Sequence, residues 1–391
     1  MTQAAFFNTG MSQQAFLEQY WQKKPLLIRG AFSAPVTDLT PEELAGLACE
    51  TDIESRLVQQ LAKQEWSLQS GPFAETDFSK LPDQDWTLLV QDVDKHWPSL
   101  QALWQSFQLI PDWRRDDIMA SYAVPGGSVG AHVDNYDVFL LQAEGVRQWQ
   151  IEDQPLTDPE WLAGCPLRIL PSFSPCQSWE LHPGDMLYLP PGIAHHGVAK
   201  TPCLTLSVGF RAASASQWLE SLSEQLSQSP QVVRRYRDPD LQTGRSATEI
   251  DARAVQRVRG DLKSLLTESD DLLLIAMGKQ LTQLKPSLEV WQFRDQIEFA
   301  KVSELAKFFE LGNTLQRNST VPMAWASGSE QNYLFVGGAV LNLGDADPDQ
   351  LKFLCEATSL ANQDWQTLLD SPVLQKTLLQ IMQEGAYYDA G

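Results

Sequence analysis

The chain has 391 residues, of which 43% are hydrophobic and 20% are charged, a composition that excludes disordered, collagen-like and coiled-coil proteins. At roughly 100–200 residues per domain, we expect two or three domains. Asp and Glu outnumber Lys and Arg by 50 to 29, which gives a formal net charge of −21. This charge disfavours direct binding of nucleic acid or anionic lipid, and it favours solubility or a basic partner.

The start of the chain and its cysteines bear on where the protein resides. Met1 to Gly10 lacks the basic and apolar regions of a signal peptide, and no stretch approaches the ~20 apolar residues of a membrane span. The five cysteines are scattered and form no CxxC pair, which indicates reduced thiols rather than a disulfide framework or a zinc site. We therefore expect a cytoplasmic protein.

The first half of the chain changes character near residue 116. Before it, apolar spacing predicts a helix over Gln13–Trp21, a strand at Leu26–Gly30 and a helix that begins at Pro41. After it, short β-branched or aromatic runs are separated by Pro and Gly turns. This pattern predicts a small antiparallel barrel or sandwich, with strands at Ile118–Val124, Val138–Gln142, Arg147–Ile151, Asp185–Leu189 and Leu204–Phe210.

From residue 213 the pattern becomes helical. A first segment with one apolar face is separated by a polar stretch, Arg234–Thr248, from a second helical segment, Ile250–Leu284. An apolar helical hairpin that finds no partner in its own segment often packs against a second copy. Residues 213–284 are therefore predicted to be a helical dimerisation region.

The last segment, 285–391, mixes helices and strands. We expect helices and strands in the order of a winged-helix-like α+β unit, at Val302–Leu311, Thr314–Thr320, Tyr333–Leu343, Asp349–Leu360 and Val373–Glu384. Such units often bind DNA, but this segment has few basic residues, which favours a structural role.

The strongest chemical signal is His132-Val133-Asp134. In a strand, residues two apart project to the same face, so an imidazole and a carboxylate would point together into the barrel. A second imidazole enters at His195. Two histidines and one carboxylate on one side of a metal are typical of non-haem Fe(II) oxygenases. Two alternatives stay open: the histidines are satisfied core or turn residues, or the neighbouring His196 is the ligand instead of His195.

Two further groups of side chains suit small carboxylates and cations. Arg147 lies in a strand between aliphatic and aromatic neighbours, where its guanidinium fork suits the remote carboxylate of a 2-oxo acid. Asp117, Met119 and Ser121 share one strand face, and Tyr136 lies on the predicted metal-binding face. Such groups near a metal suit a cation with a flat, partly apolar head. The alternatives are that Arg147 is an ordinary surface residue and that the strand of Asp117, Met119 and Ser121 is an ordinary amphipathic strand.

Several short motifs are spread over residues 15–212. They are Trp21-Gln22-Lys23-Lys24-Pro25, Gly71-Pro72-Phe73, Pro111-Asp112-Trp113-Arg114, Val124-Pro125-Gly126-Gly127, Tyr136-Asp137-Val138-Phe139, Tyr188-Leu189-Pro190-Pro191-Gly192 and Ser207-Val208-Gly209-Phe210-Arg211. Together with the His132–Asp134 motif, they resemble those of the bacterial ribosomal oxygenases. These are JmjC-type cupin proteins that hydroxylate an arginine of a large-subunit ribosomal protein, L-sixteen, at its β-carbon.

The resemblance implies a fold and a set of cofactors. The fold would be α+β: a double-stranded β-helix (cupin/JmjC jelly roll) over 1–212, the helical dimerisation region 213–284 and the winged-helix-like domain 285–391. The resemblance implies Fe(II) on His132, Asp134 and His195, with 2-oxoglutarate and O2 as cosubstrates. The residues implied to bind 2-oxoglutarate are Arg147, Ser121 and Thr205, the last of which stands where the family has asparagine.

The resemblance also implies the partners. The substrate arginine of L-sixteen would be held by Asp117, Met119, Tyr136 and Ser207, and the protein would be a homodimer that binds neither nucleic acid nor membrane. Three rivals stay open: a related hydroxylase with a histidyl or other target, a non-catalytic cupin binding module, and a metal-dependent isomerase of the cupin type.

Overall fold

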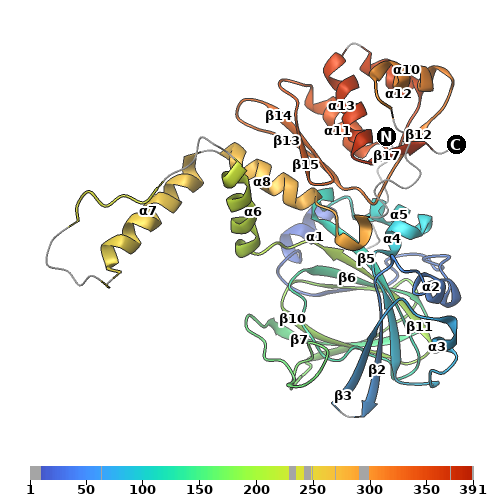
Figure 1. Ribbon diagram of the computed structural model, residues 1–391. Coiled ribbons are helices and arrows are strands. Elements are labelled where there is room, and N and C mark those ends of the chain that lie inside the picture. Colours follow the sequence, from blue (N-terminus) through green and yellow to red (C-terminus); the bar gives the residue numbers. More distant parts are fainter. Residues whose placement is uncertain are drawn as a thin grey trace. The chain divides into compact units, whose positions relative to one another are not determined.

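The computed structural model describes residues 10–62, 64–228, 235–241, 248, 250–268, 270–289, 299–369 and 371–389. The chain forms two compact units, Met1–Ala212 and Ala213–Gly391 (Figure 1). The finer division of the second unit at residue 284 stays a prediction.

The first unit is built on two antiparallel sheets. The larger sheet has eight strands in the order β1-β9-β6-β11-β5-β4-β2-β3, and the smaller has the order β10-β7-β8. The strands are β1 (Leu26–Ile28), β2 (Ser55–Ala62), β3 (Glu65–Ser70), β4 (Trp86–Val90), β5 (Arg115–Ala123), β6 (Asp137–Glu144), β7 (Arg147–Pro155), β8 (Gln177–Leu181), β9 (Met186–Leu189), β10 (Ile193–Ala199) and β11 (Cys203–Phe210). The predicted cupin barrel is thereby confirmed.

Strand β11 lies at the centre of the large sheet. It pairs with β5 on one side and β6 on the other, which places Thr205 opposite Ser121 and Ser207 opposite Met119. A strand that has neighbours on both sides and is covered on both faces has a nearly continuous apolar sequence. All residues of β11 are buried except Ser207, which is half-buried. This exception falls on the face that the sequence assigns to substrate.

Short helices cover the large sheet with aromatic side chains. They are α1 (Gln13–Gln19), α2 (Pro41–Leu47), α3 (Glu75–Phe78), α4 (Val93–His96) and α5 (Pro98–Leu103), with 3-10 helices η1 (Trp104–Phe107) and η2 (Asp112–Arg114). The ring of Phe16, from α1, lies 5.8 Å from that of Phe139 on β6. The ring of Phe107 lies 5.1 Å from Phe139 and 6.2 Å from Phe210 on β11. These contacts fix the strands that carry the site.

The prediction of a strand at His132–Asp134 is wrong. His132 forms only an isolated bridge with His195, and Asp134 lies in a loop. The preceding Gly130 has a φ of +81°, which turns the chain and prevents a continuous ladder. A Cβ there would also lie 2.6 Å from Ile169 Cδ1, so this turn requires glycine.

The second unit combines helices with two small sheets. Its helices are α6 (Ala215–Gln228), α7 (Ala252–Glu268), α8 (Asp270–Thr282), η4 (Pro286–Leu288), α10 (Val302–Glu310), α11 (Pro348–Glu356), α12 (Asn362–Leu368) and α13 (Pro372–Gln383). The sheets have the orders β16-β12-β17 and β13-β14-β15. Their strands are β12 (Leu315–Arg317), β13 (Met323–Ser327), β14 (Asn332–Val336), β15 (Ala339–Asn342), β16 (Ser359–Leu360) and β17 (Tyr387–Asp389).

Two or three strands were expected over Thr314–Thr320 and Tyr333–Leu343. The run Tyr333–Leu343 is a hairpin of two strands, because Gly337 and Gly338 turn the chain at φ values of +56° and +85°. Strand β13 pairs with this hairpin and was not predicted. The polar stretch Arg234–Thr248 lies in part outside the described residues.

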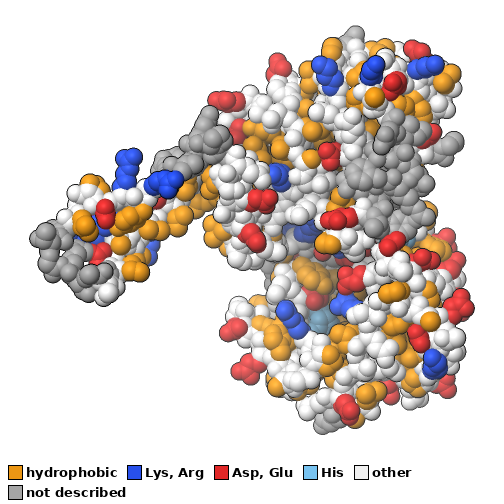
Figure 2. All heavy atoms as spheres, viewed as in Figure 1, with side chains coloured by type: hydrophobic (Ala, Val, Ile, Leu, Met, Phe, Trp, Pro, Cys, Tyr) orange, Lys and Arg blue, Asp and Glu red, His pale blue; other side chains and the backbone are white. Residues whose placement is uncertain are grey.

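Helix α7 carries an exposed apolar stripe. Val255, Val258, Leu262 and Leu266 follow helical spacing on one face, and each is between 45% and 57% exposed. Figure 2 shows hydrophobic side chains along this helix. Among the described residues, no helix combines the length and the apolar composition needed to cross a membrane.

Candidate active site

The loop that carries His132 and Asp134 is tied to β10 by backbone hydrogen bonds. The N–H of His132 donates to the carbonyl of His195 at 3.0 Å, and the N–H of His195 donates to the carbonyl of His132 at 2.9 Å. The N–H of Gly192 donates to the carbonyl of Asp134 at 2.7 Å. Segments 63 residues apart in the sequence are thus held in a fixed register, which the sequence does not specify.

Three side chains converge at this point. Asp134 Oδ2 lies 3.5 Å from His195 Nε2, and Asp134 Oδ1 lies 3.9 Å from His132 Nε2. One ligand atom from each of these residues lies within 4.8 Å of those of the other two. Two imidazole nitrogens and one carboxylate oxygen at this spacing can bind a single metal ion.

Hydrogen bonds orient both imidazoles toward the common point. His132 Nδ1 contacts the carbonyl of Gly130 at 3.0 Å, and His195 Nδ1 contacts the carbonyl of Ile193 at 2.9 Å. A carbonyl only accepts, so in each ring Nδ1 carries the proton and Nε2 keeps its lone pair. Burial lowers the pKa of His195 to about 4, and electrostatic repulsion from His132 contributes to the shift. A neutral imidazole with a free Nε2 is the form that binds metal.

Arg147 lies on β7 and is 4% exposed. Its Cζ atom is 5.8 Å from the ring centroid of Trp149, whose ring is in turn 5.8 Å from that of His195. The Nε and Nη2 atoms of Arg147 contact no hydrogen-bond partner among the described residues. These two nitrogens form the edge of the guanidinium that binds a carboxylate with two parallel hydrogen bonds.

Ser121 and Thr205 face each other across β5 and β11. The Ser121 hydroxyl donates to the carbonyl of Thr205 at 3.5 Å. The Thr205 hydroxyl donates to Gln142 Oε1 at 3.0 Å, and both residues are buried. Because a hydroxyl has a single proton, Thr205 in this arrangement offers a ligand its lone pairs and no hydrogen.

Asp117 and Tyr136 both lie close to Gly209. A Cβ atom at Gly209 would lie 3.5 Å from Asp117 Oδ1 and 3.9 Å from Tyr136 Cε2. Met119 and Ser207 are half-buried partners in the β5–β11 register. Burial raises the pKa of Tyr136, and the nearby carboxylates of Asp134 and Asp117 raise it further. The phenol stays protonated in an electronegative environment that suits a cation.

The other histidines lie outside this cluster. His196 points away from His195, and its ring packs edge-on against Phe173 with centroids 5.9 Å apart. His182 lies at a turn before β9. Sequence reasoning did not single out Trp149, although its place two residues from Arg147 on the same strand face was a usable signal. It also missed Gln142 and Gln91, for which the sequence gives no local signal.

Comparison with known proteins identifies the family. A JmjC domain model matches residues 102–218. The chain is 39% identical over 232 residues to a probable ribosomal oxygenase of Haemophilus influenzae, covering 59% of this chain and 55% of that protein. It is 35% identical over 259 residues to the ribosomal protein uL16 3-hydroxylase of Escherichia coli, covering 65% of this chain and 67% of that protein. The chain belongs to the JmjC ribosomal oxygenases.

The sequence match spans little more than half of the Haemophilus relative, whereas structural similarity extends over the whole chain. YcfD, a ribosomal oxygenase from Escherichia coli, has been solved with cobalt and succinic acid and with cobalt and 2-oxoglutarate. Each of these structures is 27% identical to this chain, with a TM-score of 0.79, and covers 98% of this chain and 100% of that one. The His132–Asp134–His195 cluster is consistent with such a metal and cosubstrate.

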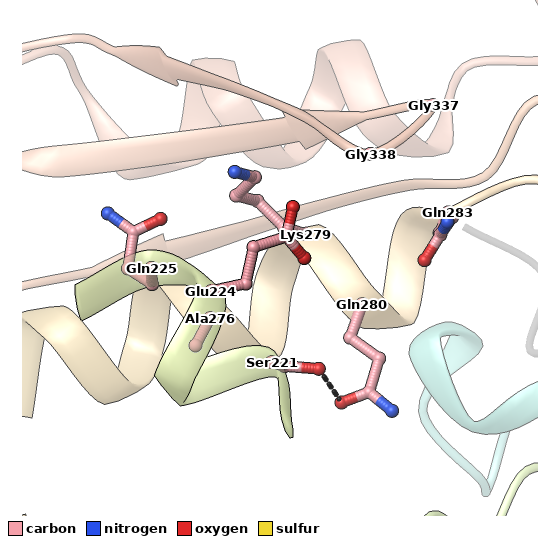
Figure 3. Close-up of a pocket in the computed structure, with 9 residues that line it drawn as sticks. All are labelled: Ser221, Glu224, Gln225, Ala276, Lys279, Gln280, Gln283, Gly337 and Gly338. Carbon is pink, nitrogen blue, oxygen red and sulfur yellow. Dashed lines mark hydrogen bonds between the residues drawn. The ribbon is translucent and has the colours of Figure 1, made fainter. Parts of the chain in front are cut away.

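A hollow in the second unit is of a different kind. It has a volume of about 230 Å³ and lies between α6, α8 and the Gly337–Gly338 turn (Figure 3). Its polar side chains bond within the unit: the Ser221 hydroxyl donates to Gln280 Oε1 at 2.7 Å, and Lys279 Nζ donates to Gln228 Oε1 at 3.4 Å. Nothing in this lining points to a particular ligand.

Proposed function

We propose that the protein is an Fe(II)- and 2-oxoglutarate-dependent dioxygenase that hydroxylates the β-carbon of an arginine in ribosomal protein uL16. The observation that carries the proposal is the convergence of His132, Asp134 and His195. The buried Nε and Nη2 atoms of Arg147, which contact no partner among the described residues, support it. Family membership supports the reaction class, and the name of the Escherichia coli relative supports the substrate.

The residues present fit an iron ion and a 2-oxo acid. His132, Asp134 and His195 would hold the metal through two imidazole Nε2 atoms and one carboxylate oxygen, and three protein ligands leave other positions open. Arg147 would bind the remote carboxylate through Nε and Nη2, and Ser121 and Thr205, buried partners on β5 and β11, would add polar contacts. Bound iron and 2-oxoglutarate supply the oxidation: 2-oxoglutarate and O2 give succinate, carbon dioxide and one oxygen atom for the substrate C–H bond.

The chain's own residues place the substrate. Asp117 would pair with the guanidinium of the substrate arginine. Met119 and Tyr136 would flank the apolar stem and the guanidinium plane of that arginine, and Ser207 would add a hydroxyl contact. Holding a flexible arginine in one pose fixes which of its carbons faces the metal, and such positioning contributes much of the catalysis. This arrangement favours arginine over histidine, because an imidazole does not need the Asp117 carboxylate.

The same proposal includes a homodimer in the cytoplasm. The stripe of Val255, Val258, Leu262 and Leu266 on α7 is more exposed than an isolated apolar helix face should be. Its helical spacing allows it to pack against the same stripe of a second copy. A ribosomal substrate places the enzyme where ribosomes are assembled. The acidic chain, with net charge −21, suits a basic ribosomal protein and disfavours direct contact with RNA.

The test separates the proposed activity from its rivals. Purified protein is incubated with Fe(II), 2-oxoglutarate, air and a peptide of uL16, and O2 uptake and succinate are measured. We expect both to rise with the arginine peptide and to be lost in Asp134→Ala. Turnover without O2 consumption would indicate an isomerase, turnover stimulated only by a histidine peptide would indicate another hydroxylase, and no turnover in metal-loaded protein would indicate a binding module.

A further inference from the structure

One carboxylate oxygen of Asp117 is held by two donors from the segment that follows β4. Asp117 Oδ2 accepts a hydrogen bond from the backbone N–H of Asp92 at 3.2 Å. With the Gln91 amide oriented so that its nitrogen faces Asp117, Gln91 Nε2 donates to the same oxygen at 2.7 Å, and Gln91 Oε1 accepts from Arg56 Nη2 at 2.6 Å. A guanidinium only donates, so Arg56 determines which end of the amide faces Asp117.

The other oxygen of Asp117 faces the proposed substrate position. The Cβ position of Gly209 is 3.5 Å from Asp117 Oδ1 and 3.9 Å from Tyr136 Cε2, which are ordinary contact distances. The glycine therefore leaves room for at least one carbon atom in contact with both the carboxylate and the phenol ring. Asp117 is 8% exposed and Tyr136 is 40% exposed, so Asp117 is the more deeply buried of the two residues.

We propose that Gln91 is a positioning residue for substrate recognition, a role that rests on the proposed function. Together with the Asp92 N–H, the Gln91 amide sets the rotation of the Asp117 carboxylate and directs Oδ1 toward Gly209 and Tyr136. A carboxylate that is oriented in advance loses less freedom when the substrate guanidinium binds. Arg56 acts one step further away, by keeping the Gln91 amide in the orientation that donates.

Two substitutions isolate this role. Gln91→Glu keeps the size of the side chain and its contact with Arg56, but it replaces the donor to Asp117 with a second acceptor. Gln91→Met keeps the length of the side chain and removes both hydrogen bonds. The matched control is Gln69→Glu, which adds the same charge at an exposed position on β3. All variants are used as full-length protein loaded with Fe(II), or with Co(II) for binding.

The readouts are KM and kcat for the uL16 peptide, the affinity of the peptide for the Co(II) and 2-oxoglutarate form, and 2-oxoglutarate consumption without peptide. Loss of a hydrogen bond to a charged group predicts a KM and a peptide Kd about tenfold higher in both Gln91 variants. Peptide-independent 2-oxoglutarate consumption should be unchanged, because Gln91 does not contact the metal cluster. Gln69→Glu should match the wild type in all three readouts.

The outcomes distinguish this inference from the proposed function. Unchanged KM and peptide affinity in Gln91→Glu and Gln91→Met, with an active wild type, would overturn the positioning role and leave the proposed function standing. A parallel loss of peptide-independent turnover would also overturn it, because it would show a general structural role. A wild type that consumes 2-oxoglutarate but binds and hydroxylates no arginine peptide would refute the substrate assignment, and the positioning role with it.

Discussion

Replacing Arg147 with Met should stabilise the ligand-free protein while removing its response to 2-oxoglutarate. Arg147 is 4% exposed, and its Nε and Nη2 atoms have no partner among the described residues. Each buried, unpaired N–H group costs about 1–3 kcal/mol. The contact of the guanidinium with the Trp149 ring offsets about 0.5–2 kcal/mol of that cost. The two groups together cost about 2–6 kcal/mol. Arg147→Met should therefore raise the free energy of unfolding by up to about 5 kcal/mol.

The ligand response should change in the opposite direction. At a 2-oxoglutarate concentration of 100 times Kd, binding stabilises the wild type by about 2.7 kcal/mol. Loss of two charge-assisted hydrogen bonds should weaken binding at least ~100-fold, so the same concentration should stabilise Arg147→Met by less than about 0.5 kcal/mol. Urea unfolding of the Co(II)-loaded protein, with and without 2-oxoglutarate, measures both effects. The exposed Arg168 provides the control variant Arg168→Met. An undiminished ligand response in Arg147→Met would refute the assignment of this carboxylate anchor.

Three other predictions concern packing, pH and assembly. A Cβ at Gly197 would lie 2.7 Å from two atoms of the Trp149 ring, so Gly197→Ala should lower the free energy of unfolding by about 1–3 kcal/mol. An unchanged midpoint of urea unfolding would contradict this packing. Burial lowers the pKa of His195 to about 4, so between pH 6.5 and 4 the unfolded chain binds a proton that the folded, metal-free protein does not. The free energy of unfolding should fall by up to about 3 kcal/mol as the pH drops through this window, and His195→Gln should lose that pH dependence. The same pH dependence in the variant and the wild type would show that other groups cause it. Leu262→Asp on α7 should convert dimers to folded monomers in sedimentation, and a wild type that is already monomeric would refute the dimer.

Much of the candidate site was predictable because its residues are close in sequence or follow strand periodicity. His132 and Asp134 were recognised as a pair two residues apart, and Asp117, Met119 and Ser121 as one face of β5. The reason given for the first pair was wrong, since the two residues lie at an isolated bridge and in a loop. Their convergence depends on hydrogen bonds to β10, which residue spacing does not encode.

The contacts around the site were not predictable, because they join segments with no local signal. Gln91 reaches Asp117, and Arg56 reaches Gln91, because β2 and β4 extend the large sheet beyond β5. The β2 sequence, Ser55–Ala62, lacks strict alternation, so its strand character arises from pairing with β3 and β4. That Arg147 Nε and Nη2 contact no partner among the described residues likewise depends on side chains of other strands, which the local sequence does not specify.

Mass spectrometry of uL16 after incubation with the enzyme tests the central claim most directly. The protein, Fe(II), 2-oxoglutarate and air are mixed with uL16, and tandem spectra locate any added oxygen. One added oxygen atom on the β-carbon of a single arginine, absent without 2-oxoglutarate and absent with His132→Ala, is the predicted result. Unmodified uL16 after incubation with metal-loaded wild type that still consumes 2-oxoglutarate would contradict the assignment of this substrate.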